Sequence, residues 1–361
     1  MKNITKLLRK DLENFSPYEA NPTLEQISQE IGIAGKDIIK LDTGENPYLE
    51  KLQSKKVLRY TSLYMYPDPL SLELRKAISD YTNISPTMIA CGNGSDEIID
   101  LVVRLFISPG DEMIILPPTF PMYSFYGSLT RATIKPVLRN SDLSISVPKI
   151  IKSITPKTKI IFIDTPGNPT GTITSSQEIE TILKQNVIVV SDEAYFEYCG
   201  ITAQPLLQKY PNLIIIRTLS KWAGLAGIRV GYLLADPKVI EKLLAIKAPY
   251  NVTALSQIVA TAALKNSGRL LKELKKMTDL RDKFVTKLQK FPDLKVYPSQ
   301  GAYIILKPRN SAKKLQKFLK SKGILVKLIN QPVIEQSLRI NICREKEIKR
   351  VLESLSDFYK K

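Results

Sequence analysis

The sequence of 361 residues contains no histidine. Mechanisms that need an imidazole are therefore excluded, among them Ser-His-Asp and Cys-His catalysis, HExxH zinc sites and histidine proton shuttles. General acid and base chemistry near neutral pH must fall to Lys, Tyr, Asp, Glu, Cys or a cofactor. This absence narrows the field of enzyme classes sharply.

Cysteines and long apolar runs are also scarce. Cys91, Cys199 and Cys343 are far apart and form no CxxC pair, which argues against a metal site or a disulfide framework and suits a reducing cytoplasm. No apolar run approaches the length that spans a membrane, and the N-terminus lacks the uninterrupted apolar core of a secretory signal. We therefore expect a cytoplasmic protein with no membrane segment and no bound metal.

The net charge of +18 raises the question of nucleic-acid binding. The basic residues are spread over the whole length and mixed with acids, and no nucleic-acid motif is recognisable. A lysine-rich solvated surface is the favoured explanation, and an anionic small substrate would also fit. We expect no nucleic-acid partner.

Five short apolar runs, each followed by a polar or glycine-rich turn, predict buried strands. They cover residues 88–91, 112–116, 159–163, 187–190 and 213–216. Helical patterns lie between several of them, so they predict βα units and a mostly parallel sheet that is buried on both faces. Ligands of such sheets bind beyond the carboxyl ends of the strands. That edge would collect Tyr123, Asn168, Asp192, Tyr195 and Lys221.

The chain divides into three predicted parts. Residues 1–40 form an N-terminal arm, residues 41–250 a large α/β domain, and residues 251–361 a smaller α/β domain. The smaller domain is expected to contain strands at 301–306, 324–329 and 337–343 and helices at 312–322 and 345–359.

The residues at the predicted strand ends share one chemistry. Lys221 can bond to an aldehyde cofactor and, when displaced, shuttle protons as a free amine. Asp192 can keep a pyridine nitrogen protonated, which makes the ring an electron sink. Asn168 and Tyr195 can donate hydrogen bonds to a phenolate oxygen, and Tyr123 can stack on the ring.

Further residues can bind anions. The turn Gly94-Ser95-Asp96 lies between a predicted strand and a helix, where free amides and the helix dipole favour a phosphate. Ser220 and Arg229 can add hydroxyl and guanidinium contacts. Arg339, in an alternating strand, can clamp a carboxylate in a bidentate fork. Together these residues suit a pyridoxal-phosphate site.

Each residue also has an ordinary structural explanation. The tyrosines can be packing aromatics, Asn168 can serve the turn before Pro169, Asp192 can cap a helix, and Arg339 can pair with a surface acid. Their co-occurrence at successive strand ends, in a chain without histidine, favours the site.

Several motifs resemble one enzyme family. Ser220-Lys221 with Arg229, Asn168-Pro169-Thr170-Gly171 and Asp192-Glu193-Ala194-Tyr195 resemble the class I/II aminotransferases, which share the aspartate-aminotransferase fold, fold type I of the pyridoxal-phosphate enzymes. Residues 44–48, 66–69, 92–97 and 117–120 are most similar to the histidinol-phosphate aminotransferases. The resemblance covers nearly the whole chain.

This resemblance implies a fold with a large, mostly parallel sheet of the seven-stranded type and a smaller C-terminal α/β domain, and a pyridoxal-phosphate cofactor. It also implies a homodimer whose N-terminal arm packs on the small domain and on the partner. The reaction would move an amino group between L-histidinol phosphate and 2-oxoglutarate, in histidine biosynthesis. Lys221 would be the catalytic residue, holding the cofactor and transferring the proton. The implied cofactor contacts are Gly94, Ser95, Asp96, Tyr123, Asn168, Asp192, Tyr195, Thr218, Ser220, Lys221 and Arg229, with Tyr66 reaching in from the partner subunit. The implied substrate contacts are Tyr18, Asn46, Lys327 and Arg339.

Three positions depart from the usual family pattern. Gly44 and Ala302 stand where the family commonly has Asn, and Lys327 where it often has Arg. These departures concern the substrate and leave the cofactor unaffected. Aromatic amino-acid transamination and phosphothreonine decarboxylation use the same scaffold and stay open as alternatives. A cofactor-binding regulator or a nucleic-acid binder is disfavoured because no helix-turn-helix segment is evident outside the catalytic motifs.

Overall fold

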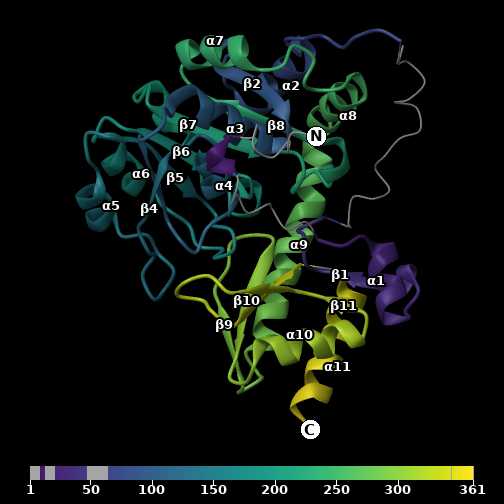
Figure 1. Cartoon of the computed structure of the whole chain (residues 1–361). Helices are drawn as coiled ribbons and strands as arrows, with labels where there is room; N and C mark the ends of the chain where they lie inside the picture. Colours follow the sequence, from purple (N-terminus) through teal and green to yellow (C-terminus); the bar gives the residue numbers. More distant parts are fainter. Residues whose placement is uncertain (1–8, 13–20, 47–63, 343, 361) are drawn as a thin grey trace, which may run out of the picture.

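The computed structural model describes residues 9–12, 21–46, 64–342 and 344–360. In Figure 1 a seven-stranded sheet with its helices fills the upper part of the molecule, and a four-stranded sheet fills the lower part. Helix α9 (Ser267–Leu288) runs between them and contacts elements of both. Within the described residues, no helix is long and apolar enough to cross a membrane.

The large sheet is mostly parallel, as predicted. Only β8 runs antiparallel to its neighbours, β2 and β7, and the remaining neighbours pair in parallel. In spatial order the strands are β2 (Ile89–Asn93), β8 (Val230–Leu234), β7 (Leu213–Thr218), β6 (Ile188–Asp192), β5 (Thr158–Asp164), β3 (Glu112–Ile115) and β4 (Thr133–Pro136).

Alternate side chains of the central strands enter two separate hydrophobic clusters. In β5, Ile161 and Ile163 belong to one cluster, whereas Ile160 and Phe162 belong to the other. This burial on both faces explains why the strands read as continuous apolar runs. Residues of α2 (Leu72–Thr82), α5 (Val147–Ser153), α6 (Ser176–Leu183) and α8 (Ala254–Lys265) join the first cluster. Residues of α3 (Gly94–Phe106), α4 (Met122–Leu129) and α7 (Pro237–Ile246) join the second.

The second sheet is antiparallel, and its strands run in the order β12 (Lys327–Ile329), β13 (Ser337–Asn341), β10 (Tyr303–Pro308) and β9 (Leu294–Tyr297). Helices α10 (Ala312–Ser321) and α11 (Glu345–Tyr359) contribute to its core. Helix α1 (Leu24–Ile31) begins at a capping box of Thr23 and Gln26. The predicted helices at 312–322 and 345–359 are confirmed to within one residue.

One predicted strand is divided in the structure. Residues 324–329 form β11 (Ile324–Leu325), which pairs with β1 (Ile39–Lys40), and then β12, which pairs with β13. The change of partner at Val326 breaks the strand, and no sequence periodicity reports such a change. The domain boundaries at residues 40 and 250 stay predictions.

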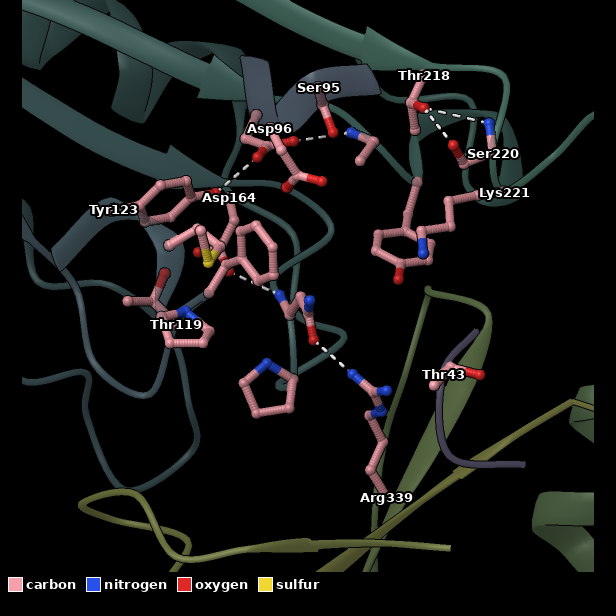
Figure 2. A pocket seen from close by; sticks show the side chains of 18 of the residues that line it. Thr43, Ser95, Asp96, Thr119, Tyr123, Asp164, Thr218, Ser220, Lys221 and Arg339 are labelled. Atoms are coloured by element: carbon pink, nitrogen blue, oxygen red, sulfur yellow. Dashed lines mark hydrogen bonds between the residues drawn. The ribbon is translucent and has the colours of Figure 1, made fainter. Parts of the chain in front are cut away.

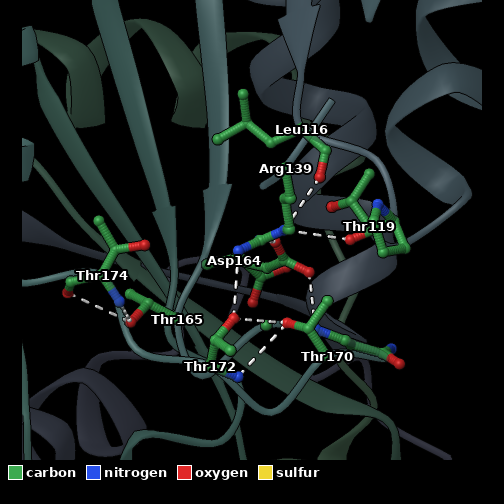
Figure 3. A network of polar contacts seen from close by, with 12 residues as sticks. Leu116, Thr119, Arg139, Asp164, Thr165, Thr170, Thr172 and Thr174 are labelled. Carbon is green, nitrogen blue, oxygen red and sulfur yellow. Dashed lines mark hydrogen bonds and ion pairs between the residues drawn. The ribbon is translucent and has the colours of Figure 1, made fainter. Parts of the chain in front are cut away.

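A buried ion pair ties together two of the loops that follow the parallel strands (Figure 3). Nη2 of Arg139 lies 2.5 Å from Oδ1 of Asp164, and both side chains are almost fully buried. Arg139 also donates to the carbonyls of Leu116, Pro118 and Leu143. Burial raises the pKa of Asp164, and the charge of Arg139 opposes that rise. Arg139 therefore holds two loops and the charge of one acid in place.

We expect Arg139→Met to destabilise the fold by about 3–5 kcal/mol, because it leaves a buried carboxylate without its partner. Arg104→Met, at an exposed pair with Asp100 on α3, is the matched control and should cost less than about 1 kcal/mol. Denaturant unfolding of both variants measures the difference. Equal losses would show that the buried pair is not a main support of the fold.

Candidate active site

A cavity of about 430 Å³ lies where the large sheet faces the smaller one (Figure 2). It opens at the carboxyl ends of β5, β6 and β7, the edge that the sequence predicted. The structure brings most of the predicted site residues together there. Its walls include Ser95, Asp96, Tyr123, Asn168, Asp192, Tyr195, Thr218, Ser220, Lys221, Arg229, Lys327 and Arg339.

The other predicted residues lie elsewhere or outside the described chain. Gly94 adjoins the wall as the first residue of α3. Asn46 is buried, and its Nδ2 lies 3.3 Å from the carbonyl oxygen of Trp222. Tyr66 is 80% exposed and stacks on Tyr250. Tyr18 falls outside the described residues.

The backbone on both sides of Lys221, shortly after the end of β7, is held in place by its contacts. The amide of Leu219 donates to the carbonyl of Val230, which continues the pairing of β7 with β8. The next residue, Trp222, is fully buried and stacks on Tyr81 at 5.2 Å between ring centroids. Lys221 itself is partly exposed, with its Nζ 5.7 Å from the centroid of the Tyr195 ring. The amine therefore points into the cavity from a fixed backbone.

Asp192, the last residue of β6, is a buried acid in a polar pocket. Its Oδ2 accepts a 2.7 Å hydrogen bond from the hydroxyl of Tyr123, and its Oδ1 accepts one from the amide of Ala194. Burial raises the pKa of this carboxyl to about 7, against the lowering effect of the Tyr123 hydrogen bond. The ring of Tyr123 stacks on Phe162 at 4.4 Å. Asp192 is thus poised to gain from a cation or a protonated ring nitrogen brought beside it.

Arg339 joins the two sheets at the far side of the cavity. It extends from β13, and its Nη1 donates to Oδ1 of Asn168 and its Nη2 to the carbonyl of Asp42, both at 2.8 Å. Its guanidinium carbon lies 5.2 Å from the centroid of the Tyr303 ring. Among the described residues, its Nε has no hydrogen-bond partner. The guanidinium thus lines the cavity while two protein oxygens hold its terminal nitrogens.

The turn that begins α3 forms the other end of the cavity. Nη2 of Arg229 lies 2.8 Å from Oδ2 of Asp96, and both side chains are partly exposed. Gly94 has a φ of +79°, and a Cβ there would come within 2.5 Å of Arg229 Nη2, so a side chain would be strained and would crowd Arg229. The hydroxyls of Thr218 and Ser220 lie 3.0 Å apart. Helix amides, two hydroxyls and a guanidinium make this end suited to a phosphate group.

Some residues of the site carried no role in the sequence analysis. Gln331 is bonded twice to the backbone of Thr119, accepting from its amide at 2.9 Å and donating to its carbonyl at 3.1 Å. Asn21 accepts at its Oδ1 a 3.1 Å hydrogen bond from Nζ of Lys327, one of the predicted substrate contacts. Asp164 ends β5 just as Asp192 ends β6, so the strand-end pattern could have identified it. Gln331 and Asn21 lie in segments without a pattern, and no sequence signal marks them.

The structure shows what surrounds Gly44, one of the three departures from the family pattern. Gly44 has a φ of +80°, and a Cβ there would lie 3.4 Å from the Tyr195 hydroxyl and 3.5 Å from Lys221 Nζ. A side chain at this position would therefore compete for the space around the amine.

Comparisons with known proteins agree on a family. Residues 36–355 match the profile described as aminotransferase class I and II. A histidinol-phosphate aminotransferase of Dehalococcoides mccartyi is 41% identical over 357 residues, which cover 98% of this chain and 98% of that protein.

Two solved structures share the fold. Histidinol-phosphate aminotransferase from Sinorhizobium meliloti, in complex with pyridoxal-5'-phosphate, has a TM-score of 0.85 at 20% identity and covers 96% of this chain and 97% of its own. Aspartate aminotransferase from Thermotoga maritima has a TM-score of 0.84 at 22% identity and covers 98% and 100%. The predicted aspartate-aminotransferase fold is confirmed, and the chain belongs to the class I and II aminotransferases.

Proposed function

We propose that this chain is a pyridoxal-phosphate-dependent histidinol-phosphate aminotransferase. It would convert L-histidinol phosphate and 2-oxoglutarate to imidazole-acetol phosphate and L-glutamate. The observation that carries the proposal is the position of Lys221 in one cavity with Asp192 and with the turn at 93–96 that begins α3. The choice of substrate follows the relatives, which are named histidinol-phosphate aminotransferases at 35–41% identity across the chain.

The donor groups of the cavity fit pyridoxal phosphate. The buried carboxyl of Asp192, whose pKa is raised to about 7, suits a protonated ring nitrogen, whose charge would lower that pKa again. The glycine turn with Arg229 suits the phosphate, which Ser95, Thr218 and Ser220 would also hold. Asn168 and Tyr195 would hold the phenolic oxygen, and Tyr123 would cover a face of the ring. When bound, the cofactor supplies an electron sink for charge that develops at the carbon bearing the amino group.

The side chains of the protein would then do three things. Lys221 would hold the cofactor through its amine and, once released from it, would carry a proton at Nζ. Arg339 would bind the carboxylate of glutamate or the phosphate of histidinol phosphate, which would replace Asn168 as its partner. Lys327, placed by Asn21, would add a second positive charge for the anionic end of the substrate.

The remaining assignments concern residues that a single chain does not place in the cavity. Tyr64, Met65 and Tyr66 are all exposed, which supports a homodimer in which Tyr66 reaches the phosphate in the partner's site. Tyr18 and Asn46 stay predicted substrate contacts, and the cytoplasm is the proposed location.

We expect Lys221→Ala to lose the visible absorbance of lysine-bound cofactor and to lower the rate of transamination by at least about a hundredfold, since it removes both the attachment and the proton carrier. Lys242→Ala, at an exposed lysine of α7, is the matched control. Absorbance spectra and steady-state rates measure both effects. A spectrum unchanged by Lys221→Ala would contradict the proposal.

The raised pKa of Asp192 predicts a pH-dependent stability in the protein without cofactor. Between the unfolded pKa of 3.8 and the folded value of about 7, the folded state binds more protons than the unfolded state. The free energy of unfolding should therefore fall as pH rises through this window, by at most ~1.4 kcal/mol per pH unit. Asp192→Asn lacks this effect.

The unfolding temperature of Asp192→Asn should therefore rise relative to that of the wild type as the pH increases across the window. Asp279→Asn, at an exposed acid, controls for the loss of a carboxyl in general. A difference that stays flat or falls with pH would show that Asp192 is not a buried acid of raised pKa.

A two-step assay tests the substrate. Glutamate should convert the bound cofactor to its amino form, and imidazole-acetol phosphate should then restore the original spectrum faster than aromatic 2-oxo acids do. Phosphothreonine decarboxylation, by contrast, would release carbon dioxide and consume no 2-oxo acid. Preference for an aromatic 2-oxo acid, or carbon dioxide release from phosphothreonine, would replace the proposed reaction with that alternative.

A further inference from the structure

A buried lysine outside the cavity links several backbone segments. Lys247 follows α7 and is only 9% exposed. Its ammonium donates to the carbonyls of Pro69, Ala248 and Pro249 at 2.8, 3.1 and 3.0 Å, and to Oδ1 of Asn251 at 3.1 Å. Burial lowers the pKa of this amine. A buried ammonium that is surrounded by carbonyls organises the backbone around it, because each carbonyl loses a partner if it moves away.

Some hydrogen bonds of this network lead to the turn at 93–96, which is suited to a phosphate. Asn251 donates from Nδ2 to Oε2 of Glu97 at 2.7 Å. The same oxygen of Glu97 accepts a 2.5 Å hydrogen bond from the amide of Asn93, the residue before Gly94. Asn93 occupies the N-cap position of α3, yet its side chain makes no capping hydrogen bond. Glu97 therefore positions the start of the helix in place of an N-cap side chain.

Other hydrogen bonds of the network lead to the segment at 66–69, which carries Tyr66. Lys247 holds the carbonyl of Pro69, and Gln257 holds the carbonyl of Asp68 at 3.0 Å. Tyr250 stacks on Tyr66 with 4.5 Å between ring centroids and 18° between planes. The segment at 247–257 thus contacts the turn at 93–97 on one side and residues 66–69 on the other.

We infer that Lys247 is a positioning residue that sets the affinity of the site for a phosphate group, by holding the turn at 93–96 and the segment at 66–69 in a fixed relation. The inference rests on the proposed function for the identity of the ligand. Hydrogen bonds weaken steeply when distance and angle depart from their optima. A small shift of the turn would therefore weaken several phosphate contacts at once. In the proposed homodimer, Tyr66 would be displaced from the partner's site as well.

The sequence has one tryptophan, Trp222, which directly follows Lys221. Quenching of its fluorescence can therefore report ligand binding without any measurement of activity. We would titrate cofactor-free protein with pyridoxal phosphate and with pyridoxal, which lacks the phosphate. Both can react with Lys221, so the ratio of their dissociation constants isolates the contribution of the phosphate.

For Lys247→Met we expect the dissociation constant of pyridoxal phosphate to rise about tenfold, the effect of losing one hydrogen bond to a charged group, and that of pyridoxal to change less than about twofold. Lys242→Met, at an exposed lysine of α7, should bind both ligands as the wild type does. Equal weakening of both ligands, or no change, would overturn the inference, since a purely structural role makes no distinction between them.

Asn251→Ala is the second variant, and it decides the question if Lys247→Met fails to fold. It leaves Lys247 with its three carbonyl partners and removes the hydrogen bonds of Asn251 to Lys247, to Glu97 and to the carbonyl of Cys91. We expect the same selective loss of affinity for pyridoxal phosphate. If the wild type binds the cofactor and Asn251→Ala leaves the ratio of the two dissociation constants unchanged, the inference is overturned and the proposed function stands. Wild-type protein that binds neither ligand would overturn the proposed function and the inference together.

Discussion

The parallel pairing of β5, β6 and β7 places three strand ends at one edge of the sheet. Asp164 pairs in register with Asp192, and Asp192 with Ile216. Polar residues that follow these strands must therefore lie close together, although many residues separate them in the sequence. Lys221 enters the same space because β7 carries it there. The meeting of Asp164, Asn168, Asp192 and Lys221 in the cavity follows from this one constraint.

Two acids at adjacent strand ends repel each other when both are charged. Different groups stabilise each of the two. Asp164 is held by Arg139, and its second oxygen accepts from the amide of Asn168. Asp192 has no buried cation beside it in the described chain and relies on the hydroxyl of Tyr123. Burial therefore raises its pKa to about 7. Asp164 is a structural support, and Asp192 is, in the proposed function, the partner of a protonated ring nitrogen.

Residues whose position depends on strand ends could be predicted from the sequence, and those that depend on packing between distant segments could not. Lys221, Asp192 and Asn168 each follow an apolar run within five residues, so the topology of a parallel sheet brings them together. Arg139 and Gln331 act on backbone of other loops, and no local pattern marks such contacts. The contact of Arg339 with Asn168 depends on how two sheets face each other. The expected contribution of Tyr66 requires a second chain.

The central claim is that the amine of Lys221 is where the cofactor is attached. Reduction of the loaded enzyme with borohydride, followed by proteolysis and mass spectrometry, tests it directly. The account predicts one pyridoxyl-modified peptide, the one that contains Lys221, in a sequence with 53 lysines and arginines. Modification of another lysine in its place, or a spread over many surface lysines, would contradict it.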